Sequence, residues 1–208
     1  MNQINSKERM DSGFLPRSPT GFFKGRRGCA LWLTGVSGAG KSTIASIVKE
    51  KLDRLELPTY ILDGDSLRQG LNHDLSFTDS DRMESVRRTA EVMKLFVDAG
   101  FVVIVSMISP FRQGRSFARS LLNEGEFWEV HVDTPLHIAE QRDPKGLYAR
   151  ARQGRMSHFT GIGSEYQCPE RPELRIPTVH VSAEVAAERI VSRCIAKGLL
   201  NVECEKDR

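Results

Sequence analysis

The sequence predicts an α/β protein in which five parallel strands form one sheet flanked by helices. Two patterns lead to this prediction: short apolar runs recur along the chain, and segments with apolar residues at helical intervals separate them. A third observation is the glycine-rich string GVSGAGKST at 35–43, which follows the first apolar run and opens the first helical pattern. An alternation of this kind favours a parallel sheet covered on both faces, with ligands at the carboxyl ends of the strands.

The expected elements follow in order along the chain. ALWLT (30–34) predicts the first strand, and apolar residues after Ser42 fall at helical intervals. TYILD (59–63) predicts the second strand, a helix is expected over 84–100, and VVIVSM (102–107) predicts the third strand. Two more strands are expected at 127–133 and at TVHVS, 178–182, before an amphipathic helix over 183–199. The length suits one domain over 28–203, between a polar arm (1–27) and a polar tail (204–208).

Composition narrows the class of protein. The 30 basic and 27 acidic residues leave a net charge of +3, too small to require nucleic acid or an anionic membrane as partner. The four cysteines show neither C-x-x-C spacing nor histidines at metal-ligand intervals. The amino-terminal segment lacks the apolar core of a secretory signal, and FVVIV is far shorter than the about 20 residues that span a bilayer. We therefore expect a cytoplasmic protein with small anionic ligands.

The glycine-rich string predicts a phosphate-binding loop. In this pattern backbone N–H groups point at phosphate oxygens, the lysine reaches the β- and γ-phosphates, and the Ser or Thr hydroxyl holds Mg²⁺. The helix expected from Lys41–Ser42 would direct its positive end at the same anion. We expect ATP and Mg²⁺ as ligands, with Lys41 neutralising the transferred group and Ser42 binding the metal. The nucleotide-binding residues would be Gly35, Val36, Ser37, Gly38, Ala39, Gly40, Lys41, Ser42 and Thr43.

Two acidic residues stand at the end of the second expected strand. In LDGDSLR, Asp63 and Asp65 flank a glycine that permits a tight turn. One carboxylate could orient the metal through water and accept the proton of the acceptor hydroxyl. The alternative is that D-G-D forms only a turn and a helix cap. The position beside a phosphate loop, where open α/β sheets bind substrates, favours the catalytic interpretation.

Basic residues are concentrated in two stretches, one after Asp65 and one at RDPKGLYARARQGR, 142–155. A run of charges is usually a solvated surface, but the second stretch has few apolar residues and precedes the last strand. We interpret the segment 142–163 as a mobile lid that brings cations to the phosphates and excludes water. The aromatic residues Phe77 and Phe159 frame this region, and each taken alone is better explained by packing than by contact with a ligand.

Seven strings together resemble one family. They are GVSGAGKST, LDGDSLRQGL, DLSFTDSDR, ISPFR, VDTPL, RDPKGLYARAR and FTGI, and they occur in the order and spacing of adenylylsulfate kinases, from about Gly28 to Leu174. The resemblance implies transfer of the ATP γ-phosphoryl group to the 3′-hydroxyl of adenosine 5′-phosphosulfate (APS), a step of sulfate assimilation. It also implies a P-loop fold like that of nucleoside monophosphate kinases, a homodimer, and association with a sulfurylase partner.

The resemblance further implies a role for each matching position. Asp63 would be the base and metal organiser, supported by Asp65. The serine of ISP is described as a phosphoserine site in bacterial members, and the resemblance would give this role to Ser109. Direct in-line transfer is our working mechanism. The other implied contacts are Arg68 and Arg82 with the phosphosulfate, Phe77 and Phe159 with the acceptor adenine, Ile108 and Ser109 with the acceptor pocket, and Lys145 and Arg152 in the lid over both nucleotides.

The sequence departs from the family pattern in places. The family usually has asparagine where Ser85 stands and glycine where Ser76 stands, and GLYKKAR has become GLYARAR. Because serine has a shorter side chain and a smaller set of donors and acceptors than asparagine, the change at Ser85 bears on substrate affinity and less on reaction type.

Two other functions stay open at this stage. A kinase of the same fold could phosphorylate another small hydroxyl compound, although a sugar offers no aromatic face for Phe77 and Phe159. A nucleotide-binding regulatory subunit without turnover is the second alternative. The presence of the base and the cations argues against it: Lys41, Ser42, Asp63 and Arg82.

Overall fold

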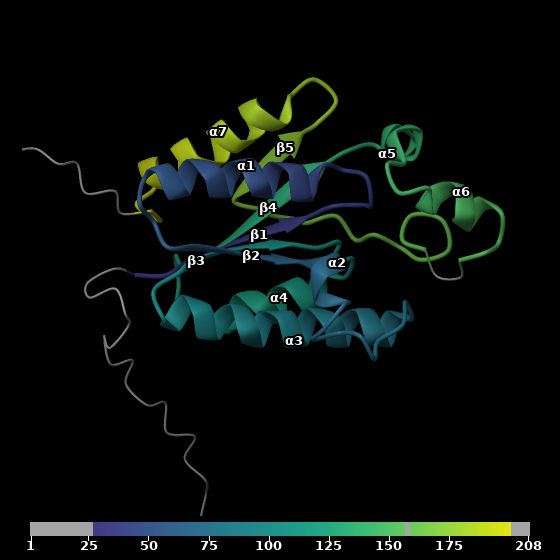
Figure 1. The fold of residues 1–208 in the computed structure, drawn as a ribbon, viewed down its shortest axis with the longest axis horizontal. Helices are drawn as coiled ribbons and strands as arrows, with labels where there is room; N and C mark the ends of the chain where they lie inside the picture. Colours follow the sequence, from purple (N-terminus) through teal and green to yellow (C-terminus); the bar gives the residue numbers. More distant parts are fainter. Residues whose placement is uncertain (1–26, 157–158, 201–208) are drawn as a thin grey trace, which may run out of the picture.

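The computed structural model describes residues 27–156 and 159–200. Five parallel strands form one sheet in the order β2–β3–β1–β4–β5 (Figure 1). The strands are β1 (Cys29–Thr34), β2 (Thr59–Asp63), β3 (Val102–Ser106), β4 (Phe127–Asp133) and β5 (Leu174–Pro177). The predicted five-stranded parallel sheet is confirmed.

Helices cover both faces of the sheet. On one face lie α1 (Lys41–Arg54) and α7 (Ala183–Ala196), and on the other α3 (Asp79–Asp98) and α4 (Arg112–Ser120) (Figure 1). The short helix α2 (Gly64–Leu67) follows β2, and α5 (Leu136–Arg142) and α6 (Leu147–Arg152) lie beyond one end of the sheet. Each face buries its own apolar cluster, because successive side chains of a strand point to opposite faces. On β1, Leu31 and Leu33 join the α1/α7 cluster, whereas Ala30 and Trp32 join the α3/α4 cluster.

The parallel arrangement collects the strand ends at one edge. Ser106 at the end of β3 is in register with Leu33 of β1 and with Asp63 of β2. The loop after β1 therefore lies beside the acidic turn after β2 and the loop after β3. The described chain enters β1 and leaves α7 at the opposite end of the sheet (Figure 1). Within the described ranges, no helix combines the length and apolar character needed to cross a membrane.

The expected strand at 178–182 is wrong. The fifth strand is Leu174–Pro177, in which Ile176 is fully buried, whereas Val179 is 42% exposed. Thr178 N–H still bonds to Asp133 O (3.0 Å), after which the chain turns away and Ser182 caps α7 by accepting from Val185 N. The alternation in TVHVS therefore belongs to a turn and a helix cap.

Two further differences concern helix starts. Helix α3 begins at Asp79 and not at 84, because the Thr78 side chain accepts from Asp81 N and forms an N-cap. No range was predicted for helix α2, although the alternative interpretation of D-G-D included a helix cap at this turn. The arm 1–27, except Arg27, and the tail 204–208 lie outside the described residues, as do residues 157 and 158 of the expected lid.

Candidate active site

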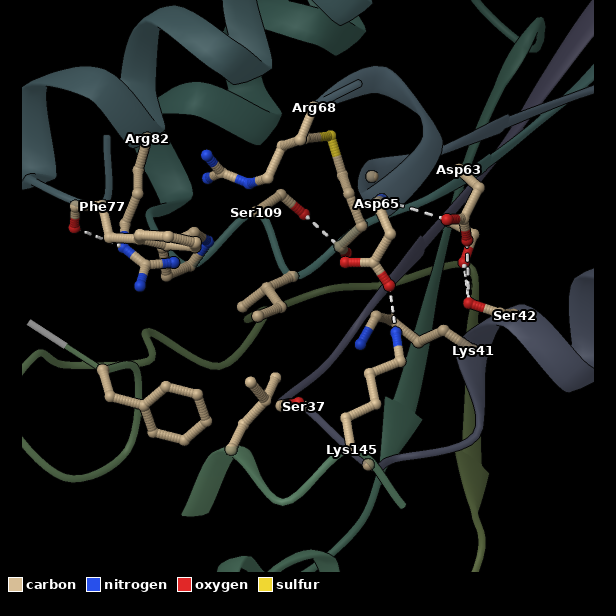
Figure 2. A pocket seen from close by; sticks show the side chains of 18 of the residues that line it. Ser37, Lys41, Ser42, Asp63, Asp65, Arg68, Phe77, Arg82, Ser109 and Lys145 are labelled. Atoms are coloured by element: carbon tan, nitrogen blue, oxygen red, sulfur yellow. Dashed lines mark hydrogen bonds and ion pairs between the residues drawn. The ribbon is translucent and has the colours of Figure 1, made fainter. Parts of the chain in front are cut away.

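A cavity of about 680 Å³ opens at the carboxyl edge of the sheet. Its walls come from the loop before α1, the turn after β2, the start of α3, the loop after β3 and the segment around α6. Figure 2 shows two groups of side chains in it: Ser42, Asp63 and Lys41 toward the right, and Phe77 and Arg82 toward the left. One continuous cavity thus joins the phosphate loop to an aromatic and basic region.

The structure brings most of the predicted site residues to this cavity. The lining includes Ser37, Gly38, Gly40, Lys41, Ser42, Thr43, Asp63, Asp65, Arg68, Phe77, Arg82, Ser85, Ile108, Ser109, Lys145 and Phe159. Gly35, Val36, Ala39 and Arg152 are not part of it. Val36 and Ala39 pack in the α1/α7 cluster, and the exposed Arg152 pairs with Glu140 (2.8 Å) on α5.

The phosphate loop is shaped by glycines. Gly38 has φ +71°, and a Cβ there would lie 2.9 Å from Ala139 O, so both conformation and space require glycine. Gly40, with φ +101°, is the N-cap of α1. Tyr148 donates its hydroxyl to Ser37 O (2.9 Å), which ties the loop to α6.

Lys41 is a buried cation that the loop itself holds. Its Nζ donates to Gly35 O (3.0 Å) and Val36 O (2.8 Å). Burial, with a further contribution from nearby Lys145, lowers the pKa of Lys41 to about 8. A bound polyphosphate would add negative charge beside this buried ammonium, beyond that of the nearby Asp63 and Asp65, so the site suits an anionic ligand.

Asp63 faces the serine of the phosphate loop. Ser42 Oγ donates to Asp63 Oδ2 (2.8 Å) and lies 3.3 Å from Ser106 Oγ. Asp63 Oδ1 accepts from the backbone N–H groups of Asp65 (3.0 Å) and Ser66 (3.5 Å), so Asp63 is also the N-cap of α2. The two interpretations of D-G-D are therefore compatible: one oxygen caps a helix and the other faces the phosphate loop.

Asp65 has a different partner. Its carboxylate forms an ion pair with Lys145, in the segment between α5 and α6 (Figure 2). Both side chains are more than half exposed. The contact joins the turn after β2 to the expected lid.

Two arginines surround Phe77. The Arg68 guanidinium lies 4.1 Å from the centre of the Phe77 ring, and Arg82 lies 5.6 Å from it. Arg82 Nε also donates to Phe77 O (3.0 Å). Burial lowers the pKa of both arginines, although guanidinium groups keep their charge. The result is a cationic wall that includes an exposed aromatic side chain.

Ser85 and Phe159 complete the walls. Ser85 Oγ accepts from Asn72 Nδ2 (3.0 Å), and Asn72 Oδ1 is buried with no hydrogen-bond partner in the described chain. Phe159 is 4% exposed and packs edge-on against Tyr148, with ring centres 4.9 Å apart. Phe159 is thus also a core residue, unlike Phe77, which is 42% exposed.

Sequence reasoning missed several members of the cavity wall. Among them are Ser106, at the end of β3, and Arg142, which donates to Thr178 O (2.9 Å). Ser106 stands in VVIVSM, where its position at a strand end was an available signal. Nothing in the sequence distinguished Arg142 from the other arginines of the basic stretch 142–155. The other missed residues are apolar or backbone contributors: Gly64, Val86, Met107, Pro110, Pro144, Leu147 and Met156.

The sheet order and the phosphate loop with its lysine and facing carboxylate are those of a P-loop kinase. Comparison with known proteins narrows this class. The model of the family described as adenylylsulphate kinase matches residues 27–177, and the chain belongs to this family.

Individual relatives agree with the family match. The adenylyl-sulfate kinase of Burkholderia ambifaria is 54% identical over 177 residues, which are 85% of this chain and 93% of that protein. The bifunctional enzyme NodQ of Azospirillum brasilense is 51% identical over 85% of this chain but only 28% of its own length. The solved structure of a Mycobacterium tuberculosis APS kinase with AMPPNP and APS has a TM-score of 0.79 and 45% identity, covering 82% of this chain and 99% of that one.

Proposed function

We propose that this protein is an adenylyl-sulfate kinase, which transfers the γ-phosphoryl group of ATP to the 3′-hydroxyl of APS and releases ADP and 3′-phosphoadenosine 5′-phosphosulfate. The observation that carries the proposal is the single cavity that joins a phosphate loop to a second lobe with an exposed aromatic ring between two guanidinium groups. Such a lobe suits an acceptor with both a base and an anionic group. Membership of the adenylylsulphate kinase family supports the same assignment.

The donor side follows from the loop. Backbone N–H groups of Ser37–Thr43 and the start of α1 would bind the phosphates, with Lys41 at the transferred group. Ser42 Oγ and Asp63 Oδ2, 2.8 Å apart, are the oxygen ligands that Mg²⁺ prefers, so these residues fit that ion. When bound, the ion neutralises charge on the β- and γ-phosphates.

On the acceptor side, Arg68 and Arg82 would bind the phosphosulfate, and Phe77 and Phe159 would contact the adenine. The acceptor 3′-oxygen forms a bond to the γ-phosphorus as the bond to the ADP oxygen breaks, and the hydroxyl proton passes to the Asp63 carboxylate. Asp65 would support this arrangement through Lys145, by holding the lid segment 142–163 near the loop. Arg152 would reach the nucleotide only if its pair with Glu140 opened.

A coupled ADP-release assay tests the assignment. ADP release from MgATP should be stimulated by APS and not by AMP or gluconate. Stimulation by gluconate alone would indicate a kinase for another hydroxyl compound. Nucleotide binding without turnover on any of these acceptors would indicate a regulatory subunit.

Assembly is the second part of the proposal. The family resemblance supports a homodimer, and the bifunctional relative that carries a similar segment supports cooperation with a sulfurylase. Light scattering on the purified chain should give twice its 23.4 kDa mass. A monomer at micromolar concentration would contradict the dimer without affecting the assigned reaction.

A further inference from the structure

The side chain of Arg115, on α4, donates hydrogen bonds to three different segments of the described chain. This side chain is 3% exposed. Nε donates to Glu129 Oε1 (2.6 Å) on β4, Nη1 to Ser109 O (2.7 Å) in the loop after β3, and Nη2 to Gln167 O (2.7 Å). Such an arrangement uses the fixed fork of a guanidinium, which a lysine cannot reproduce.

The contact with Ser109 is notable because Ser109 has a backbone conformation that few residues adopt. Its φ is +39°, in the left-handed region that favours glycine. Two other residues also hold it: Trp32 Nε1 donates to Ser109 Oγ (3.0 Å), and Thr34 Oγ1 donates to Ile108 O (2.7 Å). An unfavourable conformation persists only when its surroundings determine it, so these anchors have a structural task.

Arg115 itself is not among the described residues that line the cavity, whereas Ile108 and Ser109 are. Any effect of Arg115 on the acceptor must therefore pass through this loop. The bond from Arg115 to Gln167 supports the same loop after β3, because Gln167 N–H in turn donates to Pro110 O (2.9 Å). Glu129, whose side chain is 12% exposed, compensates the buried positive charge.

We propose that Arg115 is a positioning residue for the acceptor site: its guanidinium holds Ser109 in the left-handed conformation, and so fixes the Ile108–Ser109 wall against which the acceptor binds. The inference rests on the proposed function, since it assigns this wall to the acceptor. The phosphate donor would bind on the other side of the cavity, at Ser37–Thr43. We therefore expect Arg115 to have little effect on the affinity for ATP.

The test compares Arg115→Lys with a matched control, Arg119→Lys. Arg119 lies one turn further along α4 and also pairs with acidic residues, Glu173 (2.7 Å) and Glu129 (3.7 Å), but none of its hydrogen bonds or ion pairs within the described chain reaches Ser109. Arg115→Lys should raise the KM for APS about tenfold or more, with the KM for ATP changed less than about twofold. Arg119→Lys should leave both values near wild type. Equal rises for APS and ATP, or equal effects of the two variants, would overturn the proposal.

A double-mutant cycle with Ser109→Gly tests the cause. Glycine adopts positive φ without an anchor, so Arg115→Lys should cost less APS affinity in the Ser109→Gly background than in the wild type. If Arg115→Lys lowered the APS affinity equally in both backgrounds, Arg115 would not act through the backbone conformation of Ser109. If Arg115→Lys does not fold, Arg115→Gln combined with Glu129→Gln removes both buried charges together and should show the same selective loss of APS affinity.

Hydrogen exchange separates this inference from the proposed function. The backbone amides of Met107, Ile108, Ser109 and Phe111 should exchange faster in Arg115→Lys than in Arg119→Lys, measured without any substrate. Absence of APS-dependent turnover in the wild type would refute the proposed function alone, whereas unchanged exchange in Arg115→Lys would refute the anchor alone.

Discussion

Asp63 uses its two carboxylate oxygens for different partners. One oxygen accepts from Ser42 of the phosphate loop and the other caps α2. Asparagine is also a favourable N-cap, so Asp63→Asn should preserve the local fold while removing the charge and the basic lone pair. The side chain can therefore be tested for chemistry separately from structure.

We expect Asp63→Asn to lower kcat by about 10²–10⁴-fold, the usual contribution of a positioned general base, with ATP binding largely kept. Asp65→Asn breaks an exposed ion pair with Lys145, so it should lower kcat much less and leave the melting temperature unchanged. Steady-state kinetics and thermal unfolding of both variants check this. The assignment of the base fails if Asp65→Asn is the more damaging change.

Lys41 gives a pH-dependent prediction. The pKa of about 8 in the folded, nucleotide-free protein lies below the value of 10.5 for a free lysine, so between these pH values the unfolded chain binds more protons and stability rises with pH. Bound phosphates favour the ammonium form. Nucleotide binding should therefore take up a larger fraction of a proton at pH 8.5 than at pH 7, because more of Lys41 is deprotonated before binding at the higher pH.

Calorimetric titration in two buffers of different ionisation enthalpy measures this uptake. Lys41→Arg is the control, because its guanidinium stays protonated throughout this range and should show no pH-dependent uptake. The same uptake at both pH values in the wild type would show that Lys41 is not the group involved.

At the scale of elements, two segments supply the aromatic walls of the cavity in different ways. Phe77 precedes the cap of α3 and is 42% exposed, whereas Phe159 follows α6 and is 4% exposed in the α1/α7 cluster. From the sequence alone the two rings appear equivalent. Because Phe159 is buried and Phe77 is exposed, replacement by alanine should lower the stability of the fold at Phe159 and hardly change it at Phe77.

Phe77→Ala should raise the KM for APS by roughly one to two orders of magnitude, since base stacking on an aromatic ring is worth about 1–3 kcal/mol, and should leave the melting temperature nearly unchanged. Phe159→Ala should raise the same KM and also destabilise the fold by about 3–5 kcal/mol. Kinetics and thermal unfolding of each variant test both statements. An unchanged KM for APS in the two variants would exclude the adenine contact.

How far the elements could be predicted depended on the kind of signal. Strands such as β3 and β4 are buried apolar runs between clear breakers, and these were located to within a residue. β5 was misplaced because its single fully buried residue, Ile176, is a weaker signal than the alternation in TVHVS. The early start of α3 depends on a cap between Thr78 and Asp81, a pattern present in the sequence but outside the apolar period.

At the scale of the molecule, the segment 142–163 is the part whose proposed role depends on movement. It contains four arginines and one lysine, and all five are exposed: Arg142, Lys145, Arg150, Arg152 and Arg155. Trypsin should cleave the nucleotide-free protein first within 142–155, and AMPPNP together with APS should slow that cleavage at least about tenfold, if the segment closes over both ligands.

Mass spectrometry of the early fragments identifies the cleavage sites. If AMPPNP alone slowed the cleavage and APS had no further effect, the segment 142–163 would close over the phosphate donor and not over the acceptor. Preferential early cleavage elsewhere, unaffected by ligands, would contradict the lid.

The site as a whole was more predictable than its internal contacts. Motif residues such as Lys41 and Asp63 were identifiable because strand ends of a parallel sheet meet at one edge. The pairing of Asp65 with Lys145 and the anchoring of Ser109 by Arg115 involve residues 80 and 6 positions apart whose distances depend on the complete fold. No local pattern of the sequence contains them.

The described chain enters β1 and leaves α7 at the end of the sheet remote from the cavity. A neighbouring domain joined at either point would extend the polypeptide away from the site and leave its entrance open. The same geometry suits a stand-alone enzyme and a module of a longer chain, because neither arrangement requires the residues of the cavity to differ. That property is consistent with a relative in which a segment like this one makes up 28% of a bifunctional polypeptide.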